Sequence, residues 1–547
     1  MAHRLWSRVL LTLNLSLITS ICAFNPIEAT ISSTHRELFT GLTTCREVVS
    51  SFLSRIEALN HHTNAIISLN PHALDIGAAL DIKLESNKGS FGPLFCIPTL
   101  LKDNFDTEDM PTTGGNKAMA KSQPSSDAPI VKAIKDAGAI IIGKTNLHEL
   151  ALEGITVSSL GGQTINPYDS TRTPGGSSGG TGAAIAASFA VWGTGTDTVN
   201  SLRSPASANS LFSCRPTRGL ISRAGVIPAS FSQDTVGPIG RCVHDVAVAL
   251  SVMASVGVDR SDNVTLLAPV GIHDVNYAAS LENSSLKGFR LGVLEGFFNR
   301  LESNETTPVN DAMDETIQML RSQGTTIVSI SDGVYNATTI LELDVQRYEY
   351  RQMLESYLQN PTLKGPHPHN LQELYSTNDF LLLPSQYNFA KTALASSTSN
   401  TSYTTTLNKI DNLTHTLHEM FRQNQLDALI YPQQKNLVVP LGSPSQAGRN
   451  GILAALTGSP VITVPIGFSP ATETAKDGIP IGMEILGMPW TEELLLKIAA
   501  GMEMLRAVRR SPRWAVHSFE AGVYQNVPRI VPDVASIPVE YPVGVME

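Results

Sequence analysis

The chain has 547 residues, of which 42% are hydrophobic and 16% are charged, so it is able to bury a sizeable apolar core. Its formal net charge is −10 at pH 7 and it contains no basic cluster, which argues against nucleic acid as a partner. Because no long, flexible linker divides the sequence, we expect one compact domain.

The N-terminal segment has the pattern of a secretory signal peptide. Arg4 and Arg8 precede a short apolar run, VLLTLNLSLITSICA, that ends at Ala23. This pattern is typical of a cleaved signal, and the run contains Asn14 and is too short for a membrane anchor. We therefore expect loss of residues 1–23, no stable membrane anchor, and a protein that is secreted or lies in the secretory pathway or vacuole.

Six Asn-X-Ser/Thr sequons follow beyond residue 260. One sequon alone is weak evidence, but six of them after a signal peptide predict a glycoprotein with these segments at its surface. The asparagines are Asn263, Asn283, Asn304, Asn336, Asn400 and Asn412.

Four cysteines remain once Cys22 in the signal is set aside. They allow two disulfides in three connectivities, and buried free thiols are an equally good reading. No Cys or His spacing is typical of a metal site, since His367 and His369 lie in a Pro-rich loop with no third ligand nearby. The four cysteines are Cys45, Cys96, Cys214 and Cys242.

In the first half of the mature chain, hydrophobic periodicity predicts helices that alternate with strands. Residues 32–60 read as a helix with an early Ser/Thr cap, and residues 78–87 as a second helix. Residues 92–107 read as a buried strand ending in charge, and residues 128–152 as helix, strand, turn and helix. Residues 183–192 suit a buried helix. This alternation favours an α/β fold with helices on the faces of a sheet.

The second half continues the pattern around a long helical segment. Strands are expected in residues 285–297, 426–434, 459–468 and 478–487, and helices in 309–323, much of 335–425, and 491–508. We divide the domain, 24–547, into a catalytic core at about 90–250, a variable helical insertion at about 255–430, a sheet-and-helix part at about 425–510 and an extended tail, 527–547.

The stretch TPGGSSGGTGAAIAASFA, residues 173–190, places Ser177 and Ser178 between two pairs of glycines. Glycine loses much conformational freedom on folding, so this arrangement needs a reason. A phosphate-binding loop would have a lysine after the glycines, and a nucleophile elbow would have a strand directly before the serine. The sequence has neither, which leaves a serine held in an unusual backbone state.

Two further stretches support that third reading. Lys102 ends an apolar run in LLKDN, and Ser201 lies inside GTDTVNSLRSPAS. In this order, with TPGGSSGG between them, the stretches resemble the amidase signature family. The resemblance extends through GKTNLHELA, CRPTRGLISRAGVIPASFSQDTVGPIGR, LTGSPVITVPIGFSP and GIPIGMEILG and covers about residues 35–510. It implies a single large α/β domain, a central mixed β-sheet covered by α-helices on both faces.

The resemblance also implies a serine amidohydrolase that acts on carbon–nitrogen bonds other than peptide bonds. Ser201 would be the nucleophile, with its proton passed through Ser177 to Lys102, and Ser177 would follow a cis peptide bond from Gly176. Ser178 would support this relay by hydrogen bonding. Lysine has a pKa near 10.4, so Lys102 becomes a base only if burial lowers that value. The oxyanion would be bound by the backbone N–H groups of Thr198, Val199, Asn200 and Ser201.

The residues just before the nucleophile depart from the family. Two glycines are usual there, and this chain has Val199 and Asn200. Because β-branched valine disfavours positive φ, either the turn needs none at Val199 or its geometry differs. This departure supports one alternative function, a non-catalytic secreted binding protein on this fold. A second alternative, an esterase or acyltransferase using the same site, is one that nothing in the sequence excludes.

Other matching residues read as structural rather than catalytic. Asp197 and Arg203 are expected to form an ion pair that holds the nucleophile turn. Lys144 and Asn146 suit a strand end and a helix cap, and His148 a packed helix residue. We expect no metal or organic cofactor, and a small-molecule amide as the substrate. The signal peptide argues against partnership in an intracellular tRNA-linked amidotransferase, and the sequence does not specify the oligomeric state.

Overall fold

The computed structural model describes residues 24–86, 90–282, 284–516, 522 and 524–546. The expected signal peptide and the sequon at Asn283 lie outside these residues. Among the described helices, none has both the length and the apolar character needed to cross a membrane.

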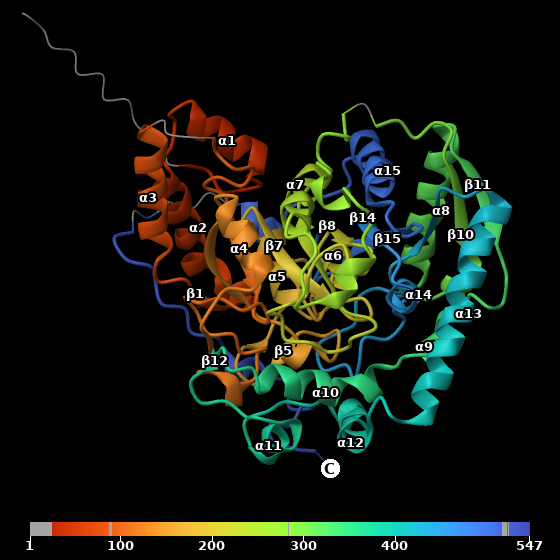
Figure 1. Ribbon diagram of the computed structural model, residues 1–547. Coiled ribbons are helices and arrows are strands. Elements are labelled where there is room, and N and C mark those ends of the chain that lie inside the picture. The colour runs from red at the N-terminus through yellow and green to blue at the C-terminus, as the bar shows by residue number, and fades with distance from the viewer. Residues whose placement is uncertain (1–23, 87–89, 283, 517–521, 523, 547) are drawn as a thin grey trace, which may run out of the picture.

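An eleven-stranded sheet forms the centre of the molecule (Figure 1). Its order is β1-β4-β2-β7-β9-β8-β14-β15-β13-β10-β11, with parallel pairs at β4-β2-β7 and β13-β10-β11 and antiparallel pairs elsewhere. The sheet is therefore mixed, as expected. Its strands are β1 (Ile66–Leu69), β2 (Pro98–Lys102), β4 (Ile140–Thr145), β7 (Trp192–Asp197), β8 (Phe212–Arg215), β9 (Thr235–Gly240), β10 (Arg290–Leu294), β11 (Thr326–Ile330), β13 (Ala428–Pro432), β14 (Val461–Phe468) and β15 (Pro480–Leu486).

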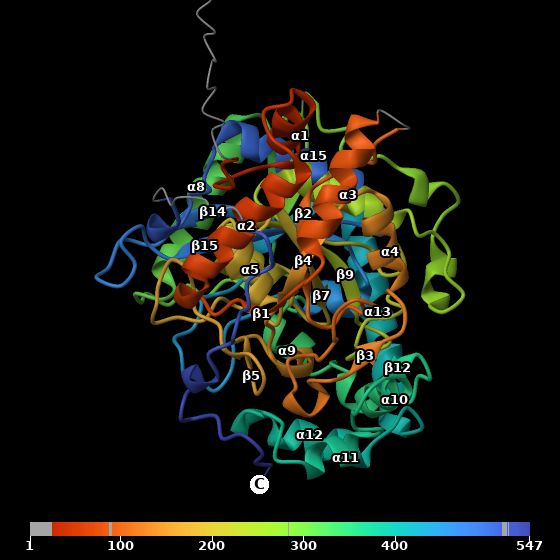
Figure 2. The same ribbon diagram turned by 90° about the vertical axis from the view of Figure 1, so that its left-hand side faces the viewer.

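Helices cover both faces of this sheet (Figures 1 and 2), which confirms the predicted fold class. Helices α10, α11 and α12 lie along its lower edge in Figure 1, and α13 runs up its right-hand side. The helices are α1 (Ile31–Phe39), α2 (Cys45–Leu59), α3 (Ala73–Glu85), α4 (Pro129–Asp136), α5 (Gly179–Ala186), α6 (Arg203–Ala208), α7 (Val243–Ala254), α8 (Thr307–Ser322), α9 (Ala337–Leu341), α10 (Gln346–Leu358), α11 (Leu371–Ser376), α12 (Tyr387–Ala395), α13 (Thr401–Asn424), α14 (Ile452–Thr457) and α15 (Glu492–Leu505).

Several elements differ from those expected. The single helix predicted over 32–60 is two helices, because Gly41 has a φ of +73° and Thr44 caps a new start at α2 in a capping box with Glu47. The helix expected after β4 is only a 3₁₀ turn, Glu149–Ala151. Strand β7 was not predicted, since its sequence, WGTGTD, alternates small residues instead of forming an apolar run.

The structure pairs two of the four cysteines. Cys45, at the start of α2, forms a disulfide with Cys96, two residues before β2. Cys214 on β8 is a buried free thiol, and Cys242 before α7 is a partly buried one. The chain thus combines the two readings that the sequence left open, one disulfide and two free thiols.

Candidate active site

Lys102 is the last residue of β2, and all five residues of that strand are buried. Its ammonium nitrogen Nζ lies 2.7 Å from Ser177 Oγ and 2.7 Å from Thr196 Oγ1, on the neighbouring strand β7. Burial lowers the pKa of Lys102 to about 7, although the charges of Asp197 and Asp234 act to raise it. Lys102 is therefore able to exist as a neutral base near pH 7.

The glycine-rich loop brings Ser177 to this lysine. The peptide bond between Gly176 and Ser177 is cis, as the resemblance implied. A Cβ atom on Gly176 would lie 2.5 Å from Thr156 Oγ1, and one on Gly179 would clash with the same atom. A Cβ on Gly180 would clash with the carbonyl oxygen of Asn146. These glycines are present because the loop backbone packs directly against its neighbours.

Ser201 lies in the turn between β7 and α6 and is 6% exposed. The backbone N–H of Ser178 donates a 3.3 Å hydrogen bond to the carbonyl oxygen of Ser201, which joins this turn to the glycine-rich loop. The hydroxyl of Ser178 also donates to the carbonyl oxygen of Thr196 at 3.3 Å. Ser178 thus holds the two serine-bearing segments side by side.

The turn of residues 198–201 accommodates its two unusual residues without left-handed backbone. Neither Val199 nor Asn200 has a positive φ. The Val199 side chain is buried in an apolar cluster that includes Phe297 and Ile452. Gly451, just before α14, makes room for this turn, because a Cβ there would lie 2.5 Å from both Asn200 Cβ and the Val199 carbonyl oxygen. The departure from two glycines is therefore compatible with an ordinary turn.

A buried ion cluster supports the same turn. Asp197 accepts hydrogen bonds from Arg203 at 3.0 Å and from Arg215 at 2.6 Å, and it also accepts the backbone N–H of Leu202 at 3.0 Å. Arg203 donates in addition to Glu484 at 2.7 Å and to the carbonyl oxygen of Val199. Burial works against ionisation, but the two guanidinium groups lower the pKa of Asp197 to about 2. The expected ion pair is part of a larger network.

The three residues read as structural lie next to β2 and the glycine-rich loop. The ammonium group of Lys144 donates to the carbonyl oxygen of Phe105 at 2.8 Å and lies 3.6 Å from the carboxylate of Asp103. Asn146 donates to the carbonyl oxygen of Gly162 at 3.0 Å. The backbone N–H of His148 donates to the carbonyl oxygen of Ser177 at 3.0 Å, and burial lowers the pKa of its imidazole to about 4.

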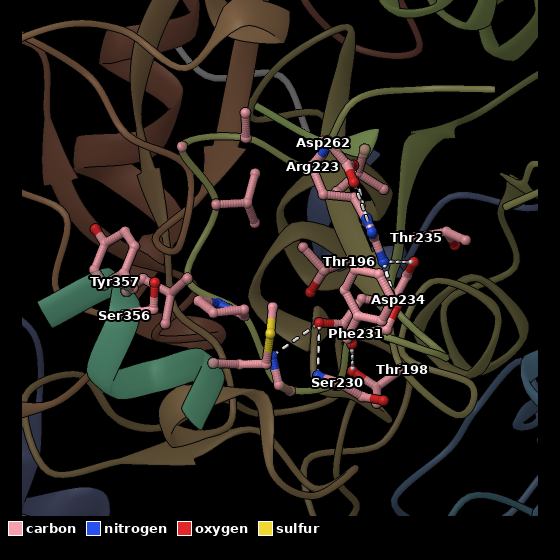
Figure 3. Close-up of a pocket in the computed structure, with 18 of the residues that line it drawn as sticks. Thr196, Thr198, Arg223, Ser230, Phe231, Asp234, Thr235, Asp262, Ser356 and Tyr357 are labelled. Atoms are coloured by element: carbon pink, nitrogen blue, oxygen red, sulfur yellow. Dashed lines mark hydrogen bonds and ion pairs between the residues drawn. The ribbon is translucent and has the colours of Figure 1, made fainter. Parts of the chain in front are cut away.

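A cavity of about 300 Å³ opens beside the nucleophile turn. Thr196, which contacts Lys102, and Thr198, from the expected oxyanion turn, both line it. Most of its wall comes from residues 223–236, and α10 supplies another side (Figure 3). The predicted helical insertion, at about 255–430, contributes residues 261–263 and part of α10 to this wall. The sequence did not predict that Thr196 and residues 223–236 line the cavity, although both lie within the stretches that carry the resemblance. Among the described residues, no cluster of His, Cys, Asp and Glu is arranged to hold a metal ion.

Comparisons with known proteins agree with this arrangement. The sequence profile of a family described as Amidase matches residues 47–496. A putative amidase of Schizosaccharomyces pombe is 30% identical over 541 residues, which cover 92% of this chain and 88% of the relative. A probable amidase of Arabidopsis thaliana is 30% identical over 533 residues, which cover 92% of this chain and 97% of the relative. The crystal structure of a peptide amidase from Stenotrophomonas maltophilia has a TM-score of 0.78, with 31% identity, 89% of this chain and 98% of that one covered.

Proposed function

The chain belongs to the amidase family, and we propose that it hydrolyses the C–N bond of a carboxylic amide, other than a peptide bond, through an acyl-enzyme on Ser201. The observation that carries the proposal is the buried contact of 2.7 Å between Lys102 Nζ and Ser177 Oγ. A lysine whose pKa is lowered to about 7 is a base able to activate a serine through that hydroxyl.

In the proposed first step, Ser201 Oγ attacks the amide carbonyl carbon. Its proton passes to Ser177 Oγ while Ser177 gives its own proton to Lys102 Nζ. The same relay, run in reverse, protonates the amine as the C–N bond breaks, and the amine leaves. A water molecule then attacks the carbonyl carbon of the acyl-enzyme and gives a proton to Lys102 through Ser177. The ester bond to Ser201 Oγ breaks and the carboxylic acid leaves, while the relay returns the proton to Ser201, so that Lys102 ends neutral.

The negative oxygen that forms during each attack needs fixed hydrogen-bond donors. The backbone N–H groups of residues 198–201 are the proposed donors, and every one of these residues retains its N–H. Removing one such donor typically costs about 3–4 kcal/mol of transition-state stabilisation. Because Val199 and Asn200 are accommodated without positive φ, the departure from two glycines gives no backbone reason to favour a non-catalytic binding protein.

A fluorophosphonate probe tests this proposal directly. We expect the probe to label the purified protein, and peptide mapping to place the label on Ser201. The labelling rate is expected to rise with pH through about 7, because only neutral Lys102 accepts the proton. The Ser201→Ala variant, confirmed as folded by circular dichroism, is the control. A folded wild-type protein that takes no label would instead favour the binding-protein alternative.

We also propose that the protein passes through the secretory pathway and carries N-linked glycans. The asparagine side chains of the five described sequons are all exposed, which supports this. We expect a glycosidase that removes N-linked glycans to lower the mass of protein from eukaryotic cells, and N-terminal sequencing to begin at Phe24. An intact N-terminus with no mass change would show that the protein does not take this route. The five residues are Asn263, Asn304, Asn336, Asn400 and Asn412.

A further inference from the structure

We propose that the cavity lined by Thr198, in the turn that carries Ser201, selects amides whose acyl part carries a positive charge close to the carbonyl group, as an amino-acid amide does. This inference rests on the proposed amide hydrolysis and specifies its substrate class. It follows from how the charged and hydrogen-bonding groups of the cavity wall are already paired in the structure.

The first observation is that the one cation of the described cavity wall is fully engaged. Arg223 donates to Asp262 through Nε at 2.8 Å and through Nη2 at 2.7 Å, and its backbone N–H donates to the same carboxylate at 2.8 Å. Its remaining nitrogen, Nη1, donates to the carbonyl oxygens of Phe231 at 2.7 Å and of Asp234 at 3.3 Å. Arg223 is thus neutralised by Asp262 and has no free edge to offer to an anionic substrate.

The second observation is that Asp234 has no ion-pair partner among the described residues, although the more distant charge of Arg223 acts to lower its pKa. Its carboxylate accepts hydrogen bonds from the hydroxyl of Thr198 at 2.6 Å and from the backbone N–H groups of Ala229 and Ser230 at 2.8 Å each. All three donors are uncharged, and no ion pair joins Asp234 to any described residue. Burial raises the pKa of Asp234, so its ionised form would gain from a cation placed beside it. Asp234 therefore gives the cavity a net negative charge.

The third observation concerns hydrogen-bond polarity. The hydroxyl of Tyr357 on α10 donates to Asp106 Oδ1 at 2.6 Å, so its oxygen is left as an acceptor for a ligand. The hydroxyl proton of Thr198 is similarly engaged with Asp234. Figure 3 shows Tyr357 on one side of the cavity and Asp234 with Thr198 on the other. Both sides thus favour a ligand that donates hydrogen bonds, which an ammonium group does.

The position and size of the cavity restrict the proposed class of substrate further. Thr198 belongs to the turn that ends at Ser201, and it contacts Asp234 directly, so a cation at Asp234 would lie near the acyl carbon. A volume of about 300 Å³ is at the small end for ligand cavities, which suits a single amino-acid residue better than a long acyl chain.

A pair of isosteric amides tests the charge alone. Glycine betaine amide carries a trimethylammonium group, and 3,3-dimethylbutanamide has a tert-butyl group of the same shape in its place. Each is used to protect Ser201 against the fluorophosphonate probe, which requires no turnover. We expect the betaine amide to protect at a concentration at least about tenfold lower than the neutral amide, and this advantage to shrink as salt is raised.

Two variants assign the effect to Asp234. Asp234→Asn is expected to reduce the advantage of the charged amide to about twofold or less. Asp314→Asn makes the same change in net charge at an exposed residue of α8 paired with Arg300, and is expected to leave the advantage unchanged. Should Asp234→Asn fail to fold, the salt dependence of the wild-type protein remains as the measurement.

The outcomes separate the two proposals. A protein that takes no label on Ser201 contradicts the proposed hydrolysis. A protein that is labelled, but is protected equally well by the two amides or better by the neutral one, contradicts the charge selection and leaves the hydrolysis standing.

Discussion

Replacing Lys102 with methionine is expected to reduce kcat/KM for amide hydrolysis by about 10²–10⁴-fold, the range typical of a lost general base. Methionine fills a similar volume but cannot accept the proton that Ser177 passes on. Steady-state kinetics with an amide substrate measures the loss, and the rate of fluorophosphonate labelling provides a second measure. A loss smaller than tenfold would show that Lys102 is not the base.

Thermal unfolding of the same variant separates loss of chemistry from loss of structure. Because the pKa of Lys102 falls from 10.5 to about 7 on folding, the unfolded chain binds more protons between these values. The free energy of unfolding of the wild-type protein therefore rises with pH between 7 and 10.5. The destabilisation that results from burying Lys102 is greatest below pH 7. The difference in Tm is expected to move in favour of Lys102→Met as pH falls from 9 to 6. A pH-independent difference would contradict the lowered pKa.

Replacing Asp197 with alanine is expected to lower the free energy of unfolding by about 3–5 kcal/mol, the usual effect of breaking a buried ion pair from one side. Arg203 would keep its ion pair with Glu484, but Arg215 would lose the ion pair that it forms with Asp197. Denaturant unfolding followed by circular dichroism measures the change.

The exposed pair of Arg300 and Asp314 provides the matched control for this experiment. Both side chains are about half exposed, so Asp314→Ala is expected to change the free energy of unfolding by less than about 1 kcal/mol.

The effect of Asp197→Ala should also diminish as pH falls from 4 towards 2, because the wild-type carboxylate is protonated as pH passes through its pKa of about 2. An effect as small as that of the control would mean that the cluster is not needed for stability.

Some helices and strands were predictable because the hydrophobic pattern of their own residues indicates them. Strands β2, β13, β14 and β15 are apolar runs that are buried throughout or nearly so, and α15 has helical spacing over its whole length. Strand β7 gave no such signal, since it is composed mainly of glycine and threonine with one tryptophan. It is a strand because β2 and β9 pair with its two edges, which is a property of the tertiary structure.

The sequence likewise identified some residues of the candidate site and gave no sign of others. Lys102, Ser177 and Ser201 could be identified in advance because three ordered stretches resemble a known family. The second contact of Lys102, with Thr196, depends on how β2 and β7 lie beside each other, and no spacing in the sequence reports it. The sequence also could not show that Asp234 lacks an ion-pair partner. This depends on which carboxylate Arg223 contacts, and the sequence offers several candidates.

The close packing of the glycine-rich loop also separates what can be altered in this protein from what cannot. Gly176, Gly179 and Gly180 leave no space for even one added carbon. The position of Ser177 relative to Lys102 therefore depends on direct packing of the loop backbone against its neighbours. Helix α10, by contrast, borders the cavity, and none of the hydrogen bonds of the described residues joins it to Lys102 or Ser177. Redesign of the substrate range is therefore best directed at Met353 and Ser356 of α10, which line the cavity and are not fully buried.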